Sequence, residues 1–469
     1  MNRFSMLING QLVEGKQHFN VLNPATEQVL AVCPAASKEQ VDQAVKAAKQ
    51  AFQTWRHTSL DTRHTLLRQI IAVIDKNQEA LAVLLSQEQG KTLVNARVEI
   101  NTGKIRLESL ITLQLPNTVL QDDAKAQVIV EHRPIGVVAA ITPWNYPFVL
   151  GLAKIATALV TGNTVVLKPS PYTPLSSLRL GELLHDIVPV GAVNIIAGLD
   201  EVGVELTHHP LVDKYTFTGS VPTGRAIAKI AAEGLKSATL ELGGNDPAIV
   251  LPDVDINKVA EKLFWGAFTN SGQICIAIKR LYVHESIRKP LIAKLAEIAQ
   301  SVKLGEGLDP ESQMGPLNNE KQLEIVSELV NDAKKQGATV VTGGERLKRP
   351  GYFFPPTIVT DIKEGVRLVD EEQFGPVLPV ISFTDVNEVI ERANRTSLGL
   401  GASVWSGDWQ KAAGIARQLE SGVAWVNRVF ETHPHAPFGG VKNSGIGREG
   451  GVWGLAGLTE LQTVSIAKG

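Results

Sequence analysis

Between residues 137 and 240 the sequence alternates short apolar runs with segments of helical periodicity, and this alternation restricts the fold more than any other feature. The runs occupy 137–141, 164–167, 193–196, 215–217 and 238–240, with helical segments at 148–160 and 176–187. Parallel strands buried on both faces give such continuous apolar runs, and helices usually connect them. The sequence therefore predicts an α/β fold, with a parallel sheet covered by helices on both faces.

A second unit with the same alternation follows Pro252. Helical periodicity recurs at 256–268, 287–302 and 386–394, and strand-like runs lie at 281–283, 339–341, 402–405 and 423–426. A chain of 469 residues is also too long for a single hydrophobic core. We therefore expect two α/β domains, the first formed by residues 1–119 and 137–243 and the second by residues 244–450.

The N-terminal part, from residue 21 to about residue 117, is predicted to be mainly helical. Ser37 with Gln40 three residues later has the pattern of a capping box. Apolar residues then recur at helical spacing in 41–52, 66–74 and 81–85, which indicates three helices.

Two further segments are predicted to be extended. Residues 128–133 alternate in polarity before Pro134, and residues 458–467 form a short apolar stretch without a local partner. Because an unpaired terminal strand usually finds a neighbour, we expect these segments to pair, within one subunit or between two.

The composition excludes several classes of function. Apolar residues make up 44% and charged residues 20% of the chain, as in ordinary globular domains, and a formal charge of −2 gives no sign of nucleic-acid or membrane binding. No run approaches the roughly 20 apolar residues of a membrane span. The two cysteines, Cys33 and Cys275, lie far apart and fit a reducing compartment. We expect a cytoplasmic enzyme with a small-molecule substrate, and we assign no metal ligands.

Polar residues gather where the predicted strands end. Asn145 and Lys168 follow the first two strands, Gly219 and Ser220 follow the fourth, and Glu241 follows the fifth. Ligands of open parallel sheets bind at the carboxyl ends of the strands, so the sequence predicts the binding site at this edge.

The loop 218–224 is the candidate for binding phosphate, because neither GxGxxG nor GxxxxGK[ST] occurs in the chain. The loop follows a strand and opens a helix, with Pro222 near the first turn. Free backbone N–H groups and the helix dipole would then face an anion. An ordinary strand-to-helix turn would have the same local features.

One thiol and one acid stand out in the stretch 240–277. Cys275 follows the small and polar residues 270–273, whereas a cysteine that serves packing usually lies in an apolar run. Glu241 lies between an apolar strand and a pair of glycines. These are a candidate nucleophile and a candidate general base. A packing role for the cysteine and a surface position for the acid remain open on these features alone.

Taken together, the motifs of the chain resemble those of the aldehyde dehydrogenase superfamily over nearly its whole length. The matching segments, in the order of the family, are TPWNYP at 142–147, VLKPS at 166–170, FTGS at 217–220, LELGGN at 240–245, GQIC at 272–275, EEQFGPV at 371–377 and PFGGVKNSGIGRE at 437–449. The resemblance implies a Rossmann-like cofactor domain, a catalytic α/β domain and a small β oligomerisation element formed by residues 120–136 and 451–469. It also implies a homodimer or homotetramer that oxidises an aldehyde with NAD(P), without acyl transfer to coenzyme A.

The resemblance further implies the roles of five catalytic residues. Cys275 attacks the aldehyde carbon, and its backbone N–H and the Asn145 side chain stabilise the oxyanion. Glu241 activates the water that hydrolyses the thioester. Lys154 and Glu449 are either members of a proton path near Glu241 or a structural ion pair.

The cofactor contacts carried over from the family lie mainly in the first domain. Lys168 would hydrogen-bond the adenosine ribose, Ser220 the pyrophosphate and Glu372 the nicotinamide ribose. Trp144 and Phe374 would line the cleft, unless they only pack in the core. The other contacts expected from the resemblance are Ile141, Thr142, Pro143, Ser170, Pro171, Gly203, Phe217, Gly219, Leu242 and Gly243.

Position 171 departs from the family pattern. Many NAD-preferring relatives carry a glutamate three residues after the lysine, whose carboxylate would accept hydrogen bonds from the ribose and repel a 2′-phosphate. Pro171 does neither. We therefore expect NAD to serve as cofactor and NADP to be excluded less strongly than usual.

The substrate tunnel is predicted by position in the family to be mostly apolar, with no arginine inside it, although Arg428 lies nearby in sequence. This favours a medium-sized apolar or aromatic aldehyde. The alternatives are cofactor-independent esterase activity at Cys275, or a non-catalytic relative; the intact Cys275, Glu241, Asn145 and Lys168 argue against the latter. The expected tunnel residues are Tyr146, Leu150, Ala153, Thr269, Ile274, Ile276, His433 and Phe438.

Overall fold

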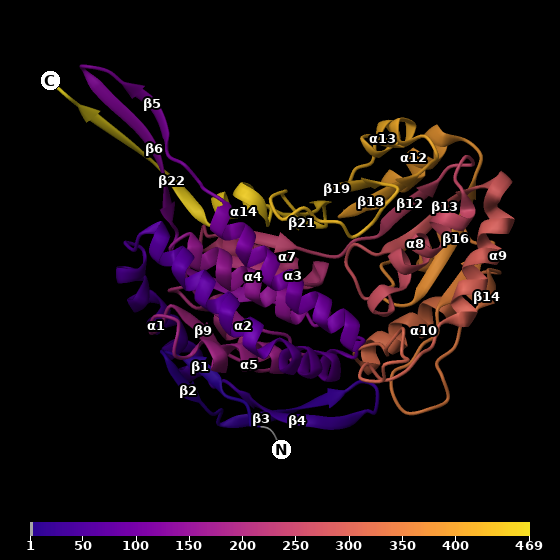
Figure 1. Ribbon diagram of the computed structural model, residues 1–469, viewed down its shortest axis with the longest axis horizontal. Coiled ribbons are helices and arrows are strands. Elements are labelled where there is room, and N and C mark those ends of the chain that lie inside the picture. The colour runs from indigo at the N-terminus through magenta and orange to yellow at the C-terminus, as the bar shows by residue number, and fades with distance from the viewer. Residues whose placement is uncertain (1–2) are drawn as a thin grey trace.

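A computed structural model describes residues 3–469 and contains two sheet-based domains and a projecting arm (Figure 1). The first sheet has the order β2-β1-β9-β8-β7-β10-β11-β21, and its five central strands are parallel. All five predicted strands are confirmed as this central group. The strands are β1 (Met6–Ile8), β2 (Gln11–Val13), β7 (Val137–Ile141), β8 (Thr164–Lys168), β9 (Val193–Ile195), β10 (Lys214–Thr218), β11 (Ser237–Glu241) and β21 (Gly445–Ile446).

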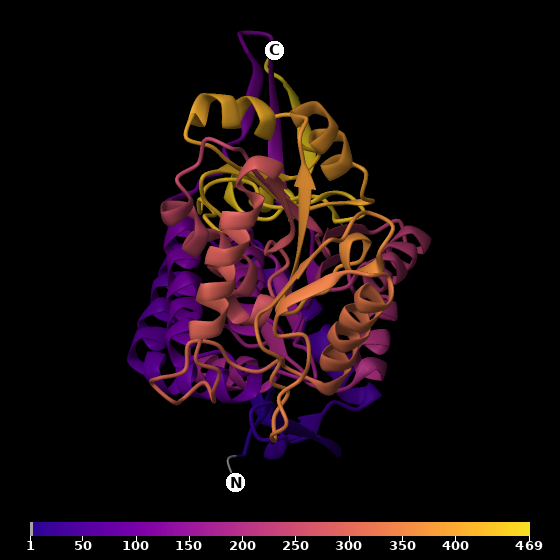
Figure 2. The same ribbon diagram turned by 90° about the vertical axis from the view of Figure 1, so that its right-hand side faces the viewer.

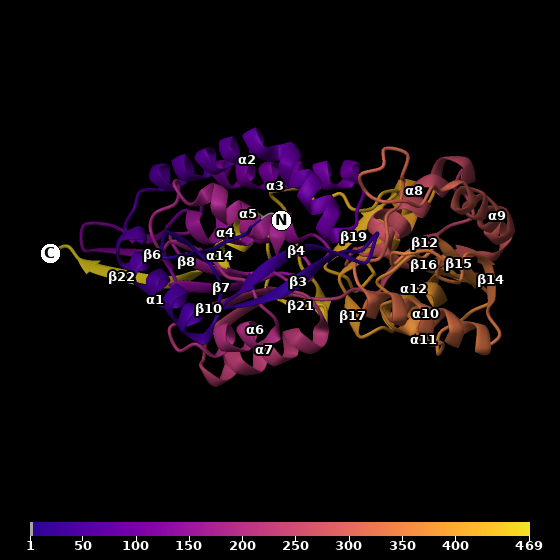
Figure 3. The same cartoon turned by 90° about the horizontal axis from the view of Figure 1, so that it is seen from below.

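Helices cover both faces of this sheet, as predicted. Figure 3 shows α4 (Pro147–Val160) and α5 (Leu175–Leu184) on one side of the strands, with α6 (Asp200–His208) and α7 (Val221–Glu233) on the other. Strands β7 to β11 are almost entirely buried. Because parallel strands run in one direction, their carboxyl ends meet at one edge, and the predicted polar residues lie there.

The N-terminal part is only partly helical. The capping box at Ser37 is confirmed at the start of α1 (Lys38–Trp55). Residues 21–35, expected to be helical, instead belong to a hairpin of β3 (Gln17–Asn23) and β4 (Gln28–Ala35). Two predicted helices merge into α2 (Leu60–Gln89), because no glycine or proline interrupts the chain before Gly90, where φ is 95°. Helix α3 (Leu93–Thr112) lies within the region predicted to be mainly helical, but no separate helix was assigned to these residues.

The second sheet has the order β14-β15-β16-β13-β12-β18-β19. The domain built on it faces the viewer in Figure 2. The predicted strands at β13, β14, β18 and β19 are confirmed, as are the helices at α8, α9 and α12. The elements are β12 (Asp246–Val250), β13 (Ile278–His284), β14 (Thr339–Thr342), β15 (Thr357–Thr360), β16 (Val377–Phe383), β18 (Gly401–Trp405), β19 (Val423–Val426), α8 (Ile256–Phe268), α9 (Glu285–Ser301), α10 (Glu320–Lys335), α11 (Arg367–Asp370), α12 (Val386–Asn394) and α13 (Trp409–Ala416).

The arm is a three-stranded antiparallel sheet that extends away from the first domain (Figure 1). Its strands are β5 (Thr118–Asp122), β6 (Ala126–Pro134) and the C-terminal β22 (Thr459–Ala467). Strand β22 pairs with β6 over its whole length, from Thr459 opposite Pro134 to Ala467 opposite Ala126. The predicted pairing is confirmed, and it occurs within one chain. None of the helices in residues 3–469 is long and apolar enough to cross a membrane.

Each domain has a hydrophobic core of its own. A separate small cluster of buried side chains, Ile274, Ile276, Ala277, Leu400 and Trp425, lies around Cys275. Tyr146 and Phe438 pack against this cluster. The site therefore has an apolar wall that belongs to neither sheet core. The remaining short elements are η1 (Thr269–Gly272), β17 (Leu398–Gly399), β20 (Val441–Lys442) and α14 (Gly451–Ala456).

Candidate active site

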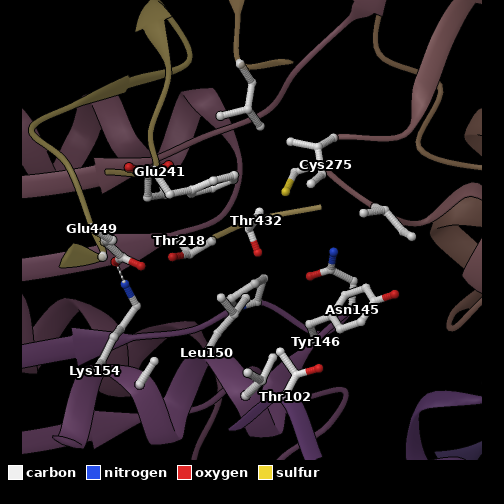
Figure 4. A pocket seen from close by; sticks show the side chains of 18 of the residues that line it. Thr102, Asn145, Tyr146, Leu150, Lys154, Thr218, Glu241, Cys275, Thr432 and Glu449 are labelled. Carbon is white, nitrogen blue, oxygen red and sulfur yellow. Dashed lines mark hydrogen bonds and ion pairs between the residues drawn. The ribbon is translucent and has the colours of Figure 1, made fainter. Parts of the chain in front are cut away.

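A cavity of about 590 Å³ brings the predicted thiol, acid and amide together (Figure 4). Asn145 reaches it from the loop after β7, Glu241 from the end of β11 and Cys275 from the loop before β13. Residues far apart in sequence thus converge because the two sheets direct their loops into the same space.

Left-handed backbone conformations shape the loop that carries Cys275. Asn270 and Ser271 have φ values of 53° and 57°, and Gly272 has a φ of 71°. A non-glycine residue in this region costs about 1 kcal/mol or more, so the surrounding structure must hold the turn in place. Gln273 does so, since its backbone N–H and its side-chain amide both donate to the Asn270 carbonyl, at 3.1 and 2.8 Å.

The Cys275 thiol is partly exposed to the cavity and surrounded mainly by apolar side chains. Burial raises the pKa of Cys275 to about 12, although the nearby Lys279 ammonium opposes this shift. The free thiol is therefore protonated at neutral pH.

Glu241 is only 3% exposed, and neither of its carboxylate oxygens has a hydrogen-bond partner among residues 3–469. Burial and, secondly, the Glu449 carboxylate raise the pKa of Glu241 well above its ordinary value. Gly439 lies against this side chain, and a Cβ there would stand 2.5 Å from Glu241 Oε1. The acid is thus buried, without a hydrogen-bond donor among residues 3–469, and it lines the cavity.

Lys154 and Glu449 form an ion pair on the Glu241 side of the cavity (Figure 4). Lys154 also donates to Thr216 Oγ1 at 2.9 Å. Burial raises the pKa of Glu449, but the Lys154 ammonium outweighs it and holds this pKa below its ordinary value. Glu449 therefore remains ionised beside Glu241.

Asn145 is fixed at its side chain and at its backbone. Its Nδ2 donates to the Gln273 carbonyl at 2.9 Å, which leaves the second N–H of the amide free. Its own carbonyl accepts from Lys91 Nζ at 2.9 Å. Lys91 is fully buried and pairs with Glu99 at 2.5 Å, and Glu99 also accepts from the backbone N–H groups of Phe148 and Val149 at the start of α4. A buried ion pair thus anchors the segment that carries Asn145.

Lys279 connects the cysteine loop to Glu372. Its Nζ donates to the carbonyls of Ile274 and Cys275, at 2.8 and 3.0 Å, and lies 3.3 Å from Glu372 Oε1. The Glu372 carboxylate also accepts from the Gly244 N–H at 3.2 Å. One buried cation therefore sets the position of the Cys275 backbone and of the acid expected to contact the cofactor.

The predicted phosphate loop follows strand β10 and opens helix α7, as expected from the sequence. Ser220 is the N-cap of α7, accepting from the Thr223 N–H at 3.4 Å, and Pro222 lies in the first turn. Lys168 is buried at the end of β8 and packs against Gly203 of α6. Burial lowers the pKa of Lys168 to about 8, while Asp200 and Glu201 in the first turn of α6 oppose this.

The residues expected to contact the cofactor divide into two groups along this sheet edge. Pro143, Trp144, Gly219, Ser220, Leu242, Gly243, Glu372 and Phe374 line the cavity itself. Ile141, Thr142, Lys168, Ser170, Pro171, Gly203 and Phe217 lie outside it, at or after the ends of β7, β8 and β10 and on α6. Trp144 and Phe374 stack edge to face with ring centroids 5.3 Å apart.

Comparison with known proteins identifies the family. A profile described as "Aldehyde dehydrogenase family" matches residues 12–464. The chain is 40% identical to peroxisomal aminoaldehyde dehydrogenase 1 of Pisum sativum, over 95% of this chain and 91% of that protein. It is 38% identical to 3-sulfolactaldehyde dehydrogenase of Pseudomonas putida, over 96% and 93% of the two chains. The chain belongs to the aldehyde dehydrogenase family.

The fold agrees with this assignment. The structure of an NAD+ complex of an aldehyde dehydrogenase from Bacillus cereus superposes with a TM-score of 0.97 at 38% identity, covering 99% of this chain and 97% of the other. Aldehyde dehydrogenases are oxidoreductases that act on aldehydes, and the convergence of Cys275, Asn145 and Glu241 on one cavity is consistent with that activity.

The residues expected in the substrate tunnel all lie on the wall of the cavity. They are Tyr146, Leu150, Ala153, Thr269, Ile274, Ile276, His433 and Phe438. The expectation that no arginine lies inside was wrong, since Arg106 and Arg448 also line it. Because no separate helix was assigned to the residues of α3, the position of Arg106 relative to the site could not be inferred. Arg428 instead pairs with Glu431 at the surface.

Other residues that shape the site were also missed. Lys91 and Glu99 lie in the region around α3, where no separate helix was assigned, and Lys279 lies four residues after Cys275. The available signal was the adjacent pair Lys279 and Arg280 inside the strand 278–283, whose other residues are apolar or aromatic. A charged residue in such a place is almost never fully buried unless it is paired.

Proposed function

We propose that this chain oxidises an aldehyde to the carboxylic acid with a nicotinamide dinucleotide, through a covalent intermediate on Cys275. The observation that supports this most directly is the arrangement of a thiol, a free amide N–H and an unpartnered carboxylate around one cavity. Each of these groups matches one step of the reaction.

The first step is loss of the Cys275 thiol proton to solvent and addition of the resulting thiolate to the aldehyde carbon, which gives a tetrahedral hemithioacetal anion. The oxyanion receives hydrogen bonds from the free N–H of the Asn145 amide and from the Cys275 backbone N–H. Removal of one such donor lowers kcat by about 100- to 1,000-fold in other enzymes. Gln273 holds the Asn145 side chain in place for this role.

In the second step the tetrahedral carbon is oxidised and a thioester with Cys275 remains. Glu241 then removes a proton from water, which attacks the thioester, releases the carboxylic acid and returns Cys275 to its free form. A carboxylate without donors and with a raised pKa is a stronger base than an ordinary glutamate. The Lys154–Glu449 pair lies where it can pass the proton onward from Glu241.

The residues present fit a nicotinamide dinucleotide. Ser220 and the N-terminus of α7 offer hydrogen-bond donors to its pyrophosphate, and Gly219 and Gly243 leave the backbone accessible on the cavity wall. A Cβ at Gly243 would lie 2.1 Å from Glu372 Oε2, so a side chain there would displace the acid expected at the nicotinamide ribose. When bound, the oxidised nicotinamide ring accepts the hydride that leaves the tetrahedral carbon.

The cofactor preference follows from the surroundings of Lys168. Pro171 supplies no carboxylate, while Asp200 and Glu201 place negative charge near the lysine. NAD is the better cofactor, and its kcat/KM exceeds that of NADP by less than about 100-fold. Pro171→Glu should raise this ratio, because a carboxylate repels the 2′-phosphate. Steady-state kinetics with both cofactors measures it, and a wild-type ratio well above 100-fold would contradict the prediction.

A medium-sized apolar or aromatic aldehyde suits the cavity, since Tyr146, Leu150, Ile274, Ile276 and Phe438 form much of its wall. The names of the relatives do not choose a substrate, because they include an aminoaldehyde and a sulfolactaldehyde. We also propose that the arm formed by residues 120–136 and 451–469 joins subunits into a homodimer or homotetramer.

The experiment that tests the proposal follows reduced nicotinamide over a panel of aliphatic, aromatic, amino and semialdehyde substrates, with NAD and with NADP. Turnover that disappears in Cys275→Ala supports it. Folded wild-type protein that binds NAD but turns over no aldehyde with either cofactor would overturn it in favour of a binding role. Ester hydrolysis without aldehyde oxidation would instead point to an esterase.

A further inference from the structure

One face of α3 forms a wall of the substrate cavity. The lining residues recur every three or four positions, which is one face of a helix; they are Asn95, Val98, Thr102, Arg106, Ser109 and Leu110. Thr102 is seen facing the cavity in Figure 4, opposite Leu150 and Tyr146. Arg106 lies one turn farther along the same face.

Arg106 differs from the other cations of this helix. Arg97 pairs with Glu79 at 2.6 Å, and Lys104 pairs with Asp75 at 2.6 Å; both acids belong to α2. The half-buried Arg106 guanidinium has no hydrogen-bond or ion-pair acceptor among residues 3–469. A partly desolvated cation with five unused N–H donors favours binding of an anion.

The protein acids along the cavity do not fill this role. Glu449 pairs with Lys154, and Glu372 lies 3.3 Å from Lys279. Glu241 and Glu449 both feel the positive charge of Arg106, but neither makes a hydrogen bond to it. Arg448 donates from Nη1 to the carbonyls of Gly440 and Gly447. Among residues 3–469, Arg106 is thus the lining cation whose side chain makes neither a hydrogen bond nor an ion pair.

The other side chains named on this wall are neutral polar or apolar groups. Thr102 and His433 offer polar groups, and Val98, Phe430 and Pro434 are apolar. An aldehyde with a positively charged tail would be repelled by Arg106, whereas an anionic tail would find unused N–H donors there.

We propose that Arg106 is a specificity-determining residue, and that the preferred substrate is an aldehyde carrying an anionic group, most simply a carboxylate, at the end remote from the aldehyde. This inference rests on the proposed aldehyde oxidation and specifies its substrate class. The apolar throat holds the carbon chain or ring, and Arg106 forms a charge-assisted, bidentate pair with the anion. The protein then selects semialdehyde acids over neutral aldehydes of the same shape.

The test compares acids with their isosteric neutral amides. The acids differ in the distance between the aldehyde and the carboxylate, because this distance decides which acid can reach both Cys275 and Arg106. They are 4-oxobutanoate, 6-oxohexanoate and 4-formylbenzoate, and each is compared with its primary amide. For at least one pair the acid should have the higher kcat/KM, by about 10- to 100-fold, the range expected for a hydrogen bond to a charged group. Arg106→Met should remove this preference mainly through KM, Arg106→Lys should keep part of it, and the loss of kcat/KM should be larger for the acids than for the amides.

Arg97→Met is the matched control, since Arg97 lies on the same helix but faces α2; it should leave the acid-to-amide ratio unchanged. Turnover of the amides with no preference for any acid would overturn the anion site while leaving aldehyde oxidation intact. Equal losses for acids and amides in Arg106→Met would also overturn it, because Arg106 would then act on the reaction centre. Failure of every acid and amide in folded, NAD-binding protein would instead refute the oxidation on which the inference rests.

Discussion

At the scale of single residues, Lys279 determines how the nucleophile and the cofactor acid are positioned together. Its ammonium is buried, donates to the carbonyls of Ile274 and Cys275, and lies beside Glu372. A buried cation with these partners does two things. It fixes the backbone of the cysteine loop, and its positive charge favours the Cys275 thiolate over the thiol.

Replacement of Lys279 by methionine should slow alkylation of Cys275 by iodoacetamide. Loss of the ammonium raises the pKa of Cys275 further, and only the thiolate reacts, so a rise of one unit slows the reaction at pH 8 about tenfold. Mass spectrometry can follow the modification. Cys33 does not interfere, because it is fully buried and burial raises its pKa.

Lys279→Arg keeps the charge and is the control, for which we expect a rate between those of the wild type and the methionine variant. Equal rates for all three folded proteins would show that Lys279 has no electrostatic effect on the thiol.

The sequence identifies the reacting residues better than those that hold them. Cys275, Glu241 and Asn145 stand in short motifs, because the chemistry requires those side chains at those places in the chain. Lys279 and Lys91 act through contacts with residues distant in sequence, such as Glu372 and Asn145, and Arg106 acts through a cavity face. Such contacts depend on tertiary packing, which no local pattern encodes.

At the scale of elements, the start of α4 depends on an acid from α3. Tyr146, the N-cap residue of α4, makes no side-chain cap hydrogen bond. Glu99 accepts from the Phe148 and Val149 N–H groups instead, at 2.9 and 3.1 Å, and pairs with Lys91. Since α4 begins directly after Asn145, this contact supports the oxyanion site.

Glu99→Ala should lower the free energy of unfolding by about 3–5 kcal/mol, because it leaves the Lys91 charge buried without its partner. Chemical denaturation measures the change. The control is Glu79→Ala, which removes the exposed pair of Glu79 with Arg97 between the same two helices and should cost less than about 1 kcal/mol. Similar losses for both variants would contradict the assigned role of Glu99.

Helices and strands could be predicted from the sequence where one face of the element, or the whole element, is buried. Strands β7 to β11 are buried almost throughout, so their composition identifies them, and α8 and α12 were predicted to the residue. Strands β3 and β4 carry exposed polar residues such as Gln17 and Gln28. Their apolar and polar residues do not alternate regularly, so the sequence lacks the period of two that marks a strand. In α3, Val94, Val98 and Ile105 are exposed, so its apolar residues do not mark one buried face.

At the scale of the whole molecule, the arm presents apolar side chains on a sheet that is exposed over much of its surface. Val119 and Leu120 of β5 are 56% and 66% exposed, and Leu461 and Ile466 of β22 are 68% and 44% exposed. Such groups of exposed apolar residues mark interaction surfaces. A second copy of the chain is the partner that we propose.

Leu461→Asp should therefore shift the protein toward the monomer, because it buries a charge in the proposed contact. Light scattering after size exclusion reports the mass. Leu235→Asp is the matched control, since Leu235 is 96% exposed on the body of the first domain and should leave the assembly unchanged. A wild-type protein that is already monomeric would refute the proposed assembly, and an unchanged oligomer in Leu461→Asp would refute a role for this side chain.

The most direct measurement of the mechanism is a search for the thioester in Glu241→Gln. The variant keeps the shape of the side chain but removes the base, so we expect attack by Cys275 and oxidation to proceed while hydrolysis fails. With the best aldehyde of the substrate panel and NAD, rapid mixing should show one burst of reduced cofactor per active site. Intact-protein mass spectrometry should show the matching acyl adduct, absent from Glu241→Gln/Cys275→Ala. Full steady-state turnover in Glu241→Gln, or a burst without an adduct on Cys275, would contradict the proposed division of roles between Cys275 and Glu241.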